Sequence, residues 1–446
     1  MISKHLRGKK YVIYRGNVLN LVFYTFIASI FVFPNFTPFS VVGPEGVLRL
    51  DQILIILILI ILTTYNFSKI EFVYNLTTIS LFGVVATIWI SYIVGSFLFN
   101  HPSGAGEIFD LLIWTLYIPL LSLIPISLNQ TSVRKSVFII VWGSLFVSLI
   151  GLTQLFGIWS EVNILSNVLY GPGKFINNNR LDSIFTNPNT YGQFLLLPFF
   201  ILLSILSQTN SLNNGKVTTK PWFVGITSLL VSINLYFTHS RTSFLALIIG
   251  ISIFMLILIV QNEFVDLSNA IPISLALGAF SSITLLFLRT SQRYNFLLNP
   301  LQSDSLQIRF DLWKNTLPII RQSILVGHGP SSAAILEAGV PTIDSGILGW
   351  VFHYGIIGGF LLMIFYLSIV RLSISIVMNE DTKHSEPTIW ALGKGVLIYT
   401  LIVPILAITM PVPRYRRVFT LYLGATLLIM AYIINTKKNL DAQSKT

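Results

Sequence analysis

Arginine residues between the apolar stretches of this chain are its best candidates for chemistry. If the N-terminus lies in the cytoplasm, the cytoplasmic segments carry mostly lysine, whereas the external segments carry mostly arginine. The external arginines are Arg49, Arg180, Arg241, Arg289, Arg293, Arg309, Arg321, Arg414, Arg416 and Arg417. Because a guanidinium binds phosphate through paired hydrogen bonds and lysine acts as a hydrated point charge, this asymmetry predicts a phosphate-containing ligand on the external side.

Three of these arginines stand in short sequence motifs. Arg180 precedes an Asn-Pro-Asn turn, Arg241 lies in a tight turn between two apolar stretches, and Arg309 falls on an amphipathic segment. All three could converge on one pyrophosphate, where they would stabilise the negative charge that develops on a leaving phosphate. The alternative for any external arginine is an anchor to lipid phosphates. We prefer that alternative for Arg49, Arg289, Arg293 and Arg321.

A second basic cluster consists of Arg414, Arg416 and Arg417 in one short external turn. Positive charge on the external side goes against the usual distribution, which makes this cluster a candidate second phosphate site. A static anchor to the lipid headgroups explains the cluster equally well.

Asp344 is our candidate general base. A sugar hydroxyl that attacks a carbon atom must lose its proton, and a carboxylate within hydrogen-bond reach can accept it. Asp344 stands at the external end of an apolar stretch, directly before Ser345. The competing interpretation is that Asp344 caps the helix that begins at Gly346, because aspartate is a favoured cap. Asp182, His239 and His328 are lesser candidates for the base.

Polar residues beside the arginines complete the expected site. Asn187 and Asn189 fit hydrogen bonding to sugar hydroxyls, although Asn-Pro-Asn is also ordinary turn chemistry. His239 directly precedes a Ser-Arg pair and could contact the same ligand as that arginine. His328, in a Gly-His-Gly turn, could donate to a sugar hydroxyl.

The elements that must hold these residues are membrane-spanning helices. Of the 446 residues, 54% are hydrophobic and 10% charged, and the mean hydropathy is +0.77. Soluble domains of this length do not normally have such a composition. Apolar stretches long enough to cross about 30 Å of hydrocarbon occur at 18–35, 50–66, 77–99, 111–129, 137–158, 190–208, 221–239, 242–262, 268–288, 346–370, 390–411 and 418–435.

The predicted fold is therefore an all-α polytopic membrane protein with about 12 transmembrane helices in a single domain over 1–446. An even number of spans puts both termini on one side, which the basic residues near each end identify as cytoplasmic. External loops are predicted at 159–189 and 289–345. The second loop contains an amphipathic helix over 305–323, which we expect at the outer membrane interface.

Composition argues against several classes of function. The chain has no cysteine, which excludes disulfides and thiolate chemistry, and it has no HExxH, Walker or GxGxxG motif. We therefore expect no metal and no cofactor. Much of the net charge of +11 comes from cytoplasmic lysines that face anionic headgroups, so we expect no nucleic-acid partner.

Four motifs follow one another along the chain. They are RLDSIFTNPNTYG (180–192), THSRTS (238–243), IRFDLW leading into GHGP (308–313 and 327–330) and DSGILGWVFHYGIIGG (344–359). In order and spacing they resemble the bacterial O-antigen ligase and Wzy-type repeat-unit polymerase family. The resemblance implies a GT-C-like membrane glycosyltransferase that moves a glycan from an undecaprenyl-pyrophosphate donor onto an acceptor sugar. Arg180, Arg241 and Arg309 match the family's motif arginines.

Asp344 distinguishes two branches of the family that this chain resembles. The ligase branch typically has a histidine at the corresponding position, so the aspartate favours the polymerase branch. We therefore expect polymerisation of undecaprenyl-pyrophosphate-linked oligosaccharide repeat units, without a metal and with inversion at the sugar carbon. One alternative is an O-antigen ligase that transfers the glycan to lipid A or another surface anchor.

A flippase of lipid-linked oligosaccharides is the second alternative. A flippase needs charged residues in the middle of several spans, and repeated halves are expected as well. We find neither pattern in the sequence. The expected partners are lipid-linked donor and acceptor oligosaccharides, membrane lipids and a chain-length regulator protein. The expected location is the bacterial cytoplasmic (inner) membrane, with the active site on the external, periplasmic side.

Overall fold

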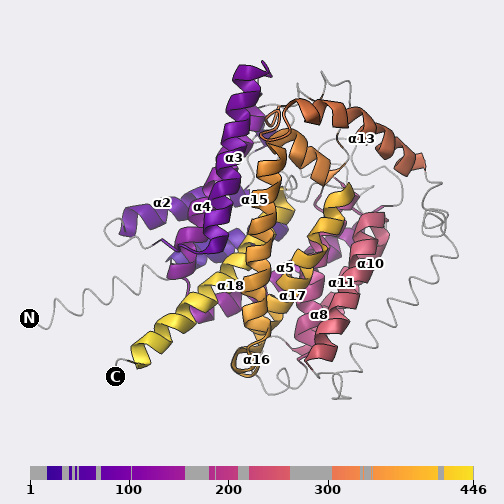
Figure 1. Ribbon diagram of the computed structural model, residues 1–446. Helices are drawn as coiled ribbons and strands as arrows, with labels where there is room; N and C mark the ends of the chain where they lie inside the picture. Colours follow the sequence, from indigo (N-terminus) through magenta and orange to yellow (C-terminus); the bar gives the residue numbers. More distant parts are fainter. Residues whose placement is uncertain are drawn as a thin grey trace, which may run out of the picture.

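The protein folds as a bundle of helices (Figure 1). The computed structural model describes residues 18–32, 40–42, 46–47, 50–66, 72–101, 103–155, 180–185, 187–208, 220–261, 304–331, 335, 343, 345–409 and 416–444. The helices are Val18–Val32, α2 (Leu50–Asn66), α3 (Leu76–Leu98), α4 (Ala105–Ser127), α5 (Gln130–Leu155), α8 (Pro188–Leu206), α10 (Pro221–Phe237), α11 (Arg241–Val260), α13 (Asp304–Gln322), α15 (Gly346–Val377), α16 (Glu380–Ser385), α17 (Pro387–Thr409) and α18 (Arg416–Gln443).

Most apolar stretches predicted from the sequence form helices. In the part of the chain that the structure describes, eight helices are long and apolar enough to cross a membrane, and three further apolar helices are shorter. These helices confirm an all-α integral membrane protein. The predicted span at 268–288 lies outside the described residues, so the count of about 12 spans remains a prediction.

A short β-hairpin lies between the first helix and α2. Its antiparallel strands are β1 (Ser40–Val42) and β2 (Gly46–Val47). The sequence patterns predict no strand here, because strands this short fall below the length at which an alternating pattern becomes visible.

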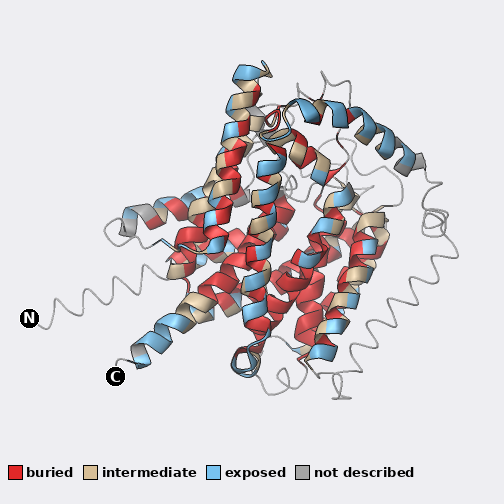
Figure 2. Ribbon diagram, viewed as in Figure 1, coloured by how far each residue is buried: buried red, intermediate tan, exposed pale blue. Residues whose placement is uncertain are grey.

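The centre of the bundle is α8, which is buried along the whole of 190–206 (Figure 2). α8 packs on α11 through Phe200, since a Cβ placed on Gly250 would lie 2.1 Å from the Phe200 Cζ atom. It packs on α17 through Ile201, which fills the space above Gly395. Glycine at such contacts lets the backbones of membrane helices approach closely.

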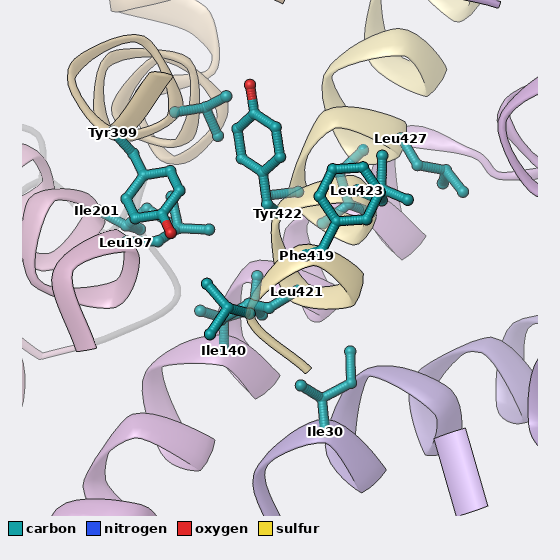
Figure 3. Packing of buried hydrophobic residues seen from close by; sticks show 14 of the residues in the cluster. Ile30, Ile140, Leu197, Ile201, Tyr399, Phe419, Leu421, Tyr422, Leu423 and Leu427 are labelled. Atoms are coloured by element: carbon teal, nitrogen blue, oxygen red, sulfur yellow. The ribbon is translucent and has the colours of Figure 1, made fainter. Parts of the chain in front are cut away.

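Further core contacts join α17 and α18 beside α8. Figure 3 shows Tyr399 of α17 next to Leu197 and Ile201 of α8. The rings of Tyr399 and Tyr422 are 5.5 Å apart, and the Tyr422 hydroxyl lies 2.8 Å from the Thr400 hydroxyl. These contacts fix α17 and α18 side by side.

The helices alternate in direction, which gives the bundle two different ends. Figure 1 shows α13 across one end and α16 at the other, and we call these the α13 end and the α16 end. α15 and α17 meet at α16, and α8 runs antiparallel to α17, so α8 and α15 both begin at the α13 end. α11 and α18 begin there as well. Because a helix N-terminus carries a partial positive charge, the backbone alone makes this end electropositive.

α15 is interrupted at Gly355, whose φ of 67° lies in the left-handed region that favours glycine. Backbone groups on both sides of the break pair with the turn that follows α13. The His328 N–H donates to the Phe352 carbonyl (2.8 Å), and the Ile356 N–H donates to the Ile324 carbonyl (2.9 Å). The turn thus satisfies polar groups that a straight helix would have paired internally, as a membrane interior requires.

Two side chains hold this turn in place. The Nδ1 atom of His353 is 2.8 Å from the Gly329 carbonyl. From the opposite side, the Ser91 hydroxyl of α3 donates to the Val326 carbonyl. α13 is therefore joined to both α15 and α3 by a rigid connection.

Candidate functional site

At the α13 end, two hydrogen bonds fix the direction of the Arg180 side chain. Its Nε–H donates to the Thr238 carbonyl (2.9 Å), and its Nη2–H donates to the Asn189 Oδ1 atom (2.8 Å). The segment is also fixed through its backbone, because the Leu181 N–H donates to the Phe237 carbonyl (2.9 Å). Arg180 is half-buried, so its position is set before any ligand arrives.

The Asn-Pro-Asn motif forms the start of α8. Asn187 is the N-cap, and its Oδ1 atom accepts the Asn189 N–H (2.8 Å), while Pro188 occupies the first helical position. Both are favoured choices at a helix start. The structure therefore gives Asn187 a turn role and gives Asn189 the task of holding Arg180.

Arg241 begins α11, three residues after the carbonyl that Arg180 contacts. The N-cap of α11 is Ser240, whose hydroxyl accepts the Ser243 N–H (3.3 Å). α8 comes close to this first turn, since a Cβ on Gly192 would lie 2.7 Å from the Ser243 Oγ atom. The structure thus brings together two arginines and the N-termini of α8 and α11. That combination attracts anions, phosphate above all.

His239 lies in the same turn with an unusual backbone. Its φ is 48°, in the left-handed region where a side chain is strained, and its N–H donates to the Tyr236 carbonyl (3.0 Å). Such a conformation costs on the order of 1 kcal/mol and persists where the surroundings enforce it, which occurs often at functional sites. His239 therefore lies beside the two arginines, as its place in the sequence predicts.

Gln154 supports the segment that carries Arg180 and was missed by sequence reasoning. Its Nε2–H donates to the Asp182 Oδ1 atom, and its Oε1 atom accepts the Ser183 N–H, both at 2.7 Å. Ser183 is fully buried with a φ of 49°, and its hydroxyl donates to the Val147 carbonyl (2.8 Å). The sequence feature that could have revealed Gln154 is its position as a polar residue in the last turn of an apolar helix. Gln154 also holds Asp182 in place, which is a lesser candidate for the general base.

Arg417 braces the same segment from α18. Its Nη1–H donates to the Ile184 carbonyl (3.1 Å), and its guanidinium carbon lies 4.9 Å from the centre of the Phe185 ring. The side chain is only 5% exposed. Arg414 lies outside the described residues, as does the side chain of Arg416. A second phosphate site at this cluster remains a prediction, with Arg417 contributing an internal support.

Arg309 lies on α13, a helix that occupies the position predicted for one over 305–323. Its side chain is half-buried, and α13 packs against α15 through a small apolar cluster that contains Ile320, Ile343 and Phe352. Arg309 is therefore at the α13 end but on a separate helix from the other two motif arginines. Convergence of all three on one ligand remains a prediction.

Asp344 itself lies outside the described residues. The residue after it, Ser345, is the N-cap of α15 and accepts the Leu348 N–H through its hydroxyl (3.3 Å). The interpretation of Asp344 as the cap of this helix is therefore wrong, because serine fills that position. Its role as a general base is untouched by this correction and remains a prediction.

His328 is enclosed by the turn that fills the break in α15. It is 1% exposed, and its Nε2 atom is 2.9 Å from the Ile319 carbonyl near the end of α13. Burial lowers the pKa of His328 below its ordinary value, which favours the neutral imidazole. Because it is buried and contacts the Ile319 carbonyl, His328 connects α13 to α15. Donation to a sugar hydroxyl would require the turn to open.

Among the residues that the structure describes, no group of three or more His, Asp or Glu side chains could hold a metal ion.

Comparisons with known proteins bear on the same region. A comparison with curated proteins gives no match. Residues 226–363 match the family model described as O-antigen ligase, a range that includes the 238–241 turn, α13 and the break in α15. This match confirms the resemblance to the O-antigen ligase and Wzy-type polymerase family over residues 226–363, which include three of the four motifs but not the one at 180–192.

Proposed function

We propose that this protein is a membrane glycosyltransferase that polymerises undecaprenyl-pyrophosphate-linked oligosaccharide repeat units into a surface polysaccharide, such as an O-antigen, a capsule or an exopolysaccharide. The matched family acts on lipid-linked oligosaccharides in surface polysaccharide synthesis. The apolar helices make the protein an integral membrane protein. An enzyme of this kind must hold a pyrophosphate at the membrane surface.

The observation that carries the proposal is the aimed guanidinium of Arg180 beside the start of α11. Hydrogen bonds to oxygens of Thr238 and Asn189 fix its direction. Arg241 follows in the same turn, and two helix N-termini add positive potential. Donors fixed before the reaction stabilise developing charge better than donors that must first reorganise.

The proposed reaction transfers a glycosyl group from the pyrophosphate of the donor to a hydroxyl group of the acceptor. A hydroxyl of the acceptor's terminal sugar attacks C1 of the donor sugar, and a new C–O bond forms. The bond between C1 and the pyrophosphate oxygen breaks, and its electron pair stays on that oxygen. The hydroxyl proton passes to a base, for which we propose Asp344, and attack opposite the leaving group inverts C1. Arg180, Arg241 and Arg309 bind the departing undecaprenyl pyrophosphate.

The α13 end is the proposed catalytic side. We place it on the external, periplasmic face of the bacterial inner membrane, with both termini in the cytoplasm, because lysines gather toward the α16 end. The arginines supply the charge for which many glycosyltransferases use a metal, so we propose a metal-independent reaction. A chain-length regulator protein is a proposed partner in the membrane.

Ligation is the second candidate, because the matched family model is described as O-antigen ligase. The donor chemistry would be identical, and the same arginines would bind the same leaving group. Only the acceptor differs, since a ligase uses lipid A or another surface anchor and a polymerase uses a second lipid-linked repeat unit.

The test is a synthesis reaction with purified protein. The protein in detergent is incubated with its native undecaprenyl-pyrophosphate-linked repeat unit in the presence of EDTA, and the products are separated by size. We expect a ladder of lipid-linked oligomers for the wild type and none for Arg309→Lys, because lysine cannot reproduce a bidentate contact.

Two controls decide between the candidates. Arg321→Lys carries the same substitution at an exposed position of the same helix and should give a normal ladder. If folded wild-type protein gives no ladder but transfers a single repeat unit to added lipid A, the protein is a ligase. If EDTA abolishes the ladder and Mg²⁺ restores it, the metal-independent mechanism is wrong.

A further inference from the structure

Gln193 is a fully buried polar side chain in the first turns of α8. It is 0% exposed, and neither its Nε2 nor its Oε1 atom has a hydrogen-bond partner in the described part of the chain. Burying an amide without hydrogen bonds costs free energy, and such groups are rare in folded proteins. Helix formation does not require a glutamine here, because an apolar residue would pack equally well. An unpartnered amide at this position therefore points to a polar ligand.

The position of Gln193 relates it to the arginine site. Residues four apart on a helix are neighbours on one face, so Gln193 lies one turn below Asn189, which holds Arg180. Phe200, seven residues later on the same face, packs on Gly250 of α11. Leu197, four residues after Gln193, lies beside Tyr399 of α17 (Figure 3), so this face of α8 lies between α11 and α17. Gln193 is thus one turn deeper in the bundle than Asn189.

The chemistry of the amide selects the kind of ligand. Gln193 offers both a donor and an acceptor. A phosphate oxygen could accept from Nε2 but would leave Oε1 unpaired, whereas a sugar hydroxyl both donates and accepts. One helical turn, about 5.4 Å, separates Gln193 from the residue that holds Arg180. Because Gln193 is fully buried, a sugar ring directly attached to the bound phosphate reaches it only when the helices packed on this face of α8 move apart.

We propose that Gln193 hydrogen-bonds hydroxyl groups of the donor sugar that is attached to the pyrophosphate, and so selects that sugar. This inference rests on the proposed function, since it takes the pyrophosphate to lie at Arg180. The arginines recognise the leaving group that all such donors share, and Gln193 recognises the part that differs between them. A buried water that pairs with the amide is the competing explanation.

The experiment compares two probes and two matched variants. The probes are undecaprenyl pyrophosphate without sugar and the native undecaprenyl-pyrophosphate-linked repeat unit, and binding is measured with the full-length protein in nanodiscs. Gln193→Met should bind the sugar-bearing lipid about tenfold more weakly and bare undecaprenyl pyrophosphate as well as the wild type does. Its Tm without ligand should rise, because the unpartnered amide is gone. Gln208→Met, a buried glutamine at the other end of α8, should leave both affinities unchanged.

A second variant guards against a folding defect. Gln193→Asn keeps the amide but shortens its reach, so it should also bind the sugar-bearing lipid more weakly and bind the bare lipid normally. Equal affinities of wild type and both Gln193 variants for the sugar-bearing lipid would overturn the proposal. A lower Tm for Gln193→Met with parallel losses for both lipids would identify a structural water. Failure of the wild type to bind either lipid would instead reject the proposed function.

Discussion

The two ends of the bundle hold their cations in different ways. At the α16 end, the Arg134 guanidinium pairs with the Glu386 carboxylate, with Nε 2.6 Å from Oε2. At the same end, the buried Lys394 ammonium lies 4.3 Å from the centre of the Trp390 ring. At the α13 end, the Arg180 guanidinium donates to a backbone carbonyl and a side-chain amide.

This difference shows how one chain can use basic residues for two purposes. A carboxylate neutralises a guanidinium, and aromatic faces together with the Gln261 Oε1 atom (3.4 Å) stabilise the buried Lys394 ammonium. Such cations join helices, here α5 to the start of α17 and α17 to α11. At the α13 end, hydrogen bonds to two oxygens fix the direction of the Arg180 guanidinium, and the N-termini of α8 and α11 add positive potential beside it.

The largest expected effect is on catalysis at the α13 end. Arg180→Lys and Arg241→Lys should each lower kcat/KM for polymer synthesis about 100-fold, which corresponds to about 3 kcal/mol of transition-state stabilisation. The Tm should stay near that of the wild type, because lysine keeps the charge and most of the packing. Steady-state kinetics with the native repeat unit would measure the first effect. Arg321→Lys is the control. If all three variants were as active as the wild type, the arginines of the α13 end would not serve the reaction, and the functional difference between the two ends would be lost.

The next effect is on stability at the α16 end. Glu386→Gln should lower the free energy of unfolding by about 2 kcal/mol, because the Arg134 guanidinium loses its charged partner in a partly buried place. Thermal unfolding in detergent would measure this change. The activity of the folded fraction should be normal. A catalytic defect without a loss of stability would show that this end contributes to the reaction.

Asn189 and Asn187 provide a matched pair within the α13 end. Asn189→Ala should lower kcat/KM about tenfold, because Arg180 loses one of the contacts that aim it. Asn187→Ala should instead lower the free energy of unfolding by about 1 kcal/mol with little change in kinetics, since it removes only the N-cap of α8. Kinetics and thermal unfolding on both variants would separate the roles. Identical profiles for the two would contradict the division of labour that the hydrogen bonds indicate.

The smallest expected effect is on the stability of the protein at acidic pH. Burial lowers the pKa of His328 in the folded protein, so the unfolded chain takes up a proton at a higher pH than the folded one. Stability should therefore fall as the pH drops below about 6.5, the ordinary value. His328→Gln, which can still donate to the Ile319 carbonyl, should lose this part of the pH dependence. Thermal unfolding at about pH 7.5 and 5.5 would test it, and equal slopes in both proteins would exclude His328 as the cause.

The sequence predicted well what depends on local pattern. Spans follow from the length and polarity of each apolar stretch, and α13 follows from its amphipathic spacing. The neighbourhood of Arg180 and Arg241 came only from motifs, since nothing in their spacing reveals a contact between segments separated by two spans. The sequence left two roles open for Asn187, and the hydrogen bond to the Asn189 N–H was needed to favour the cap.

Other features depend on tertiary contacts that local pattern does not encode. Gln154 pairs with a segment far along the chain, so its role was not visible. The break at Gly355 was hidden because Gly358 and Gly359 follow within the same motif and any of them could have marked it. Gln193 did carry a usable signal, an amide side chain within the apolar part of a predicted span, which in a membrane protein suggests function.

The backbone pairing between the turn after α13 and the broken α15 also restricts how this protein can diverge. The Ile324 and Leu325 carbonyls pair on one side of the break and the His328 and Gly329 N–H groups on the other, so one residue inserted or deleted between 325 and 328 would put the two sets out of register. Substitutions there are tolerable where the backbone conformation allows them, whereas changes in length are not. Relatives that share the mechanism should therefore vary in sequence across this stretch far more readily than in length.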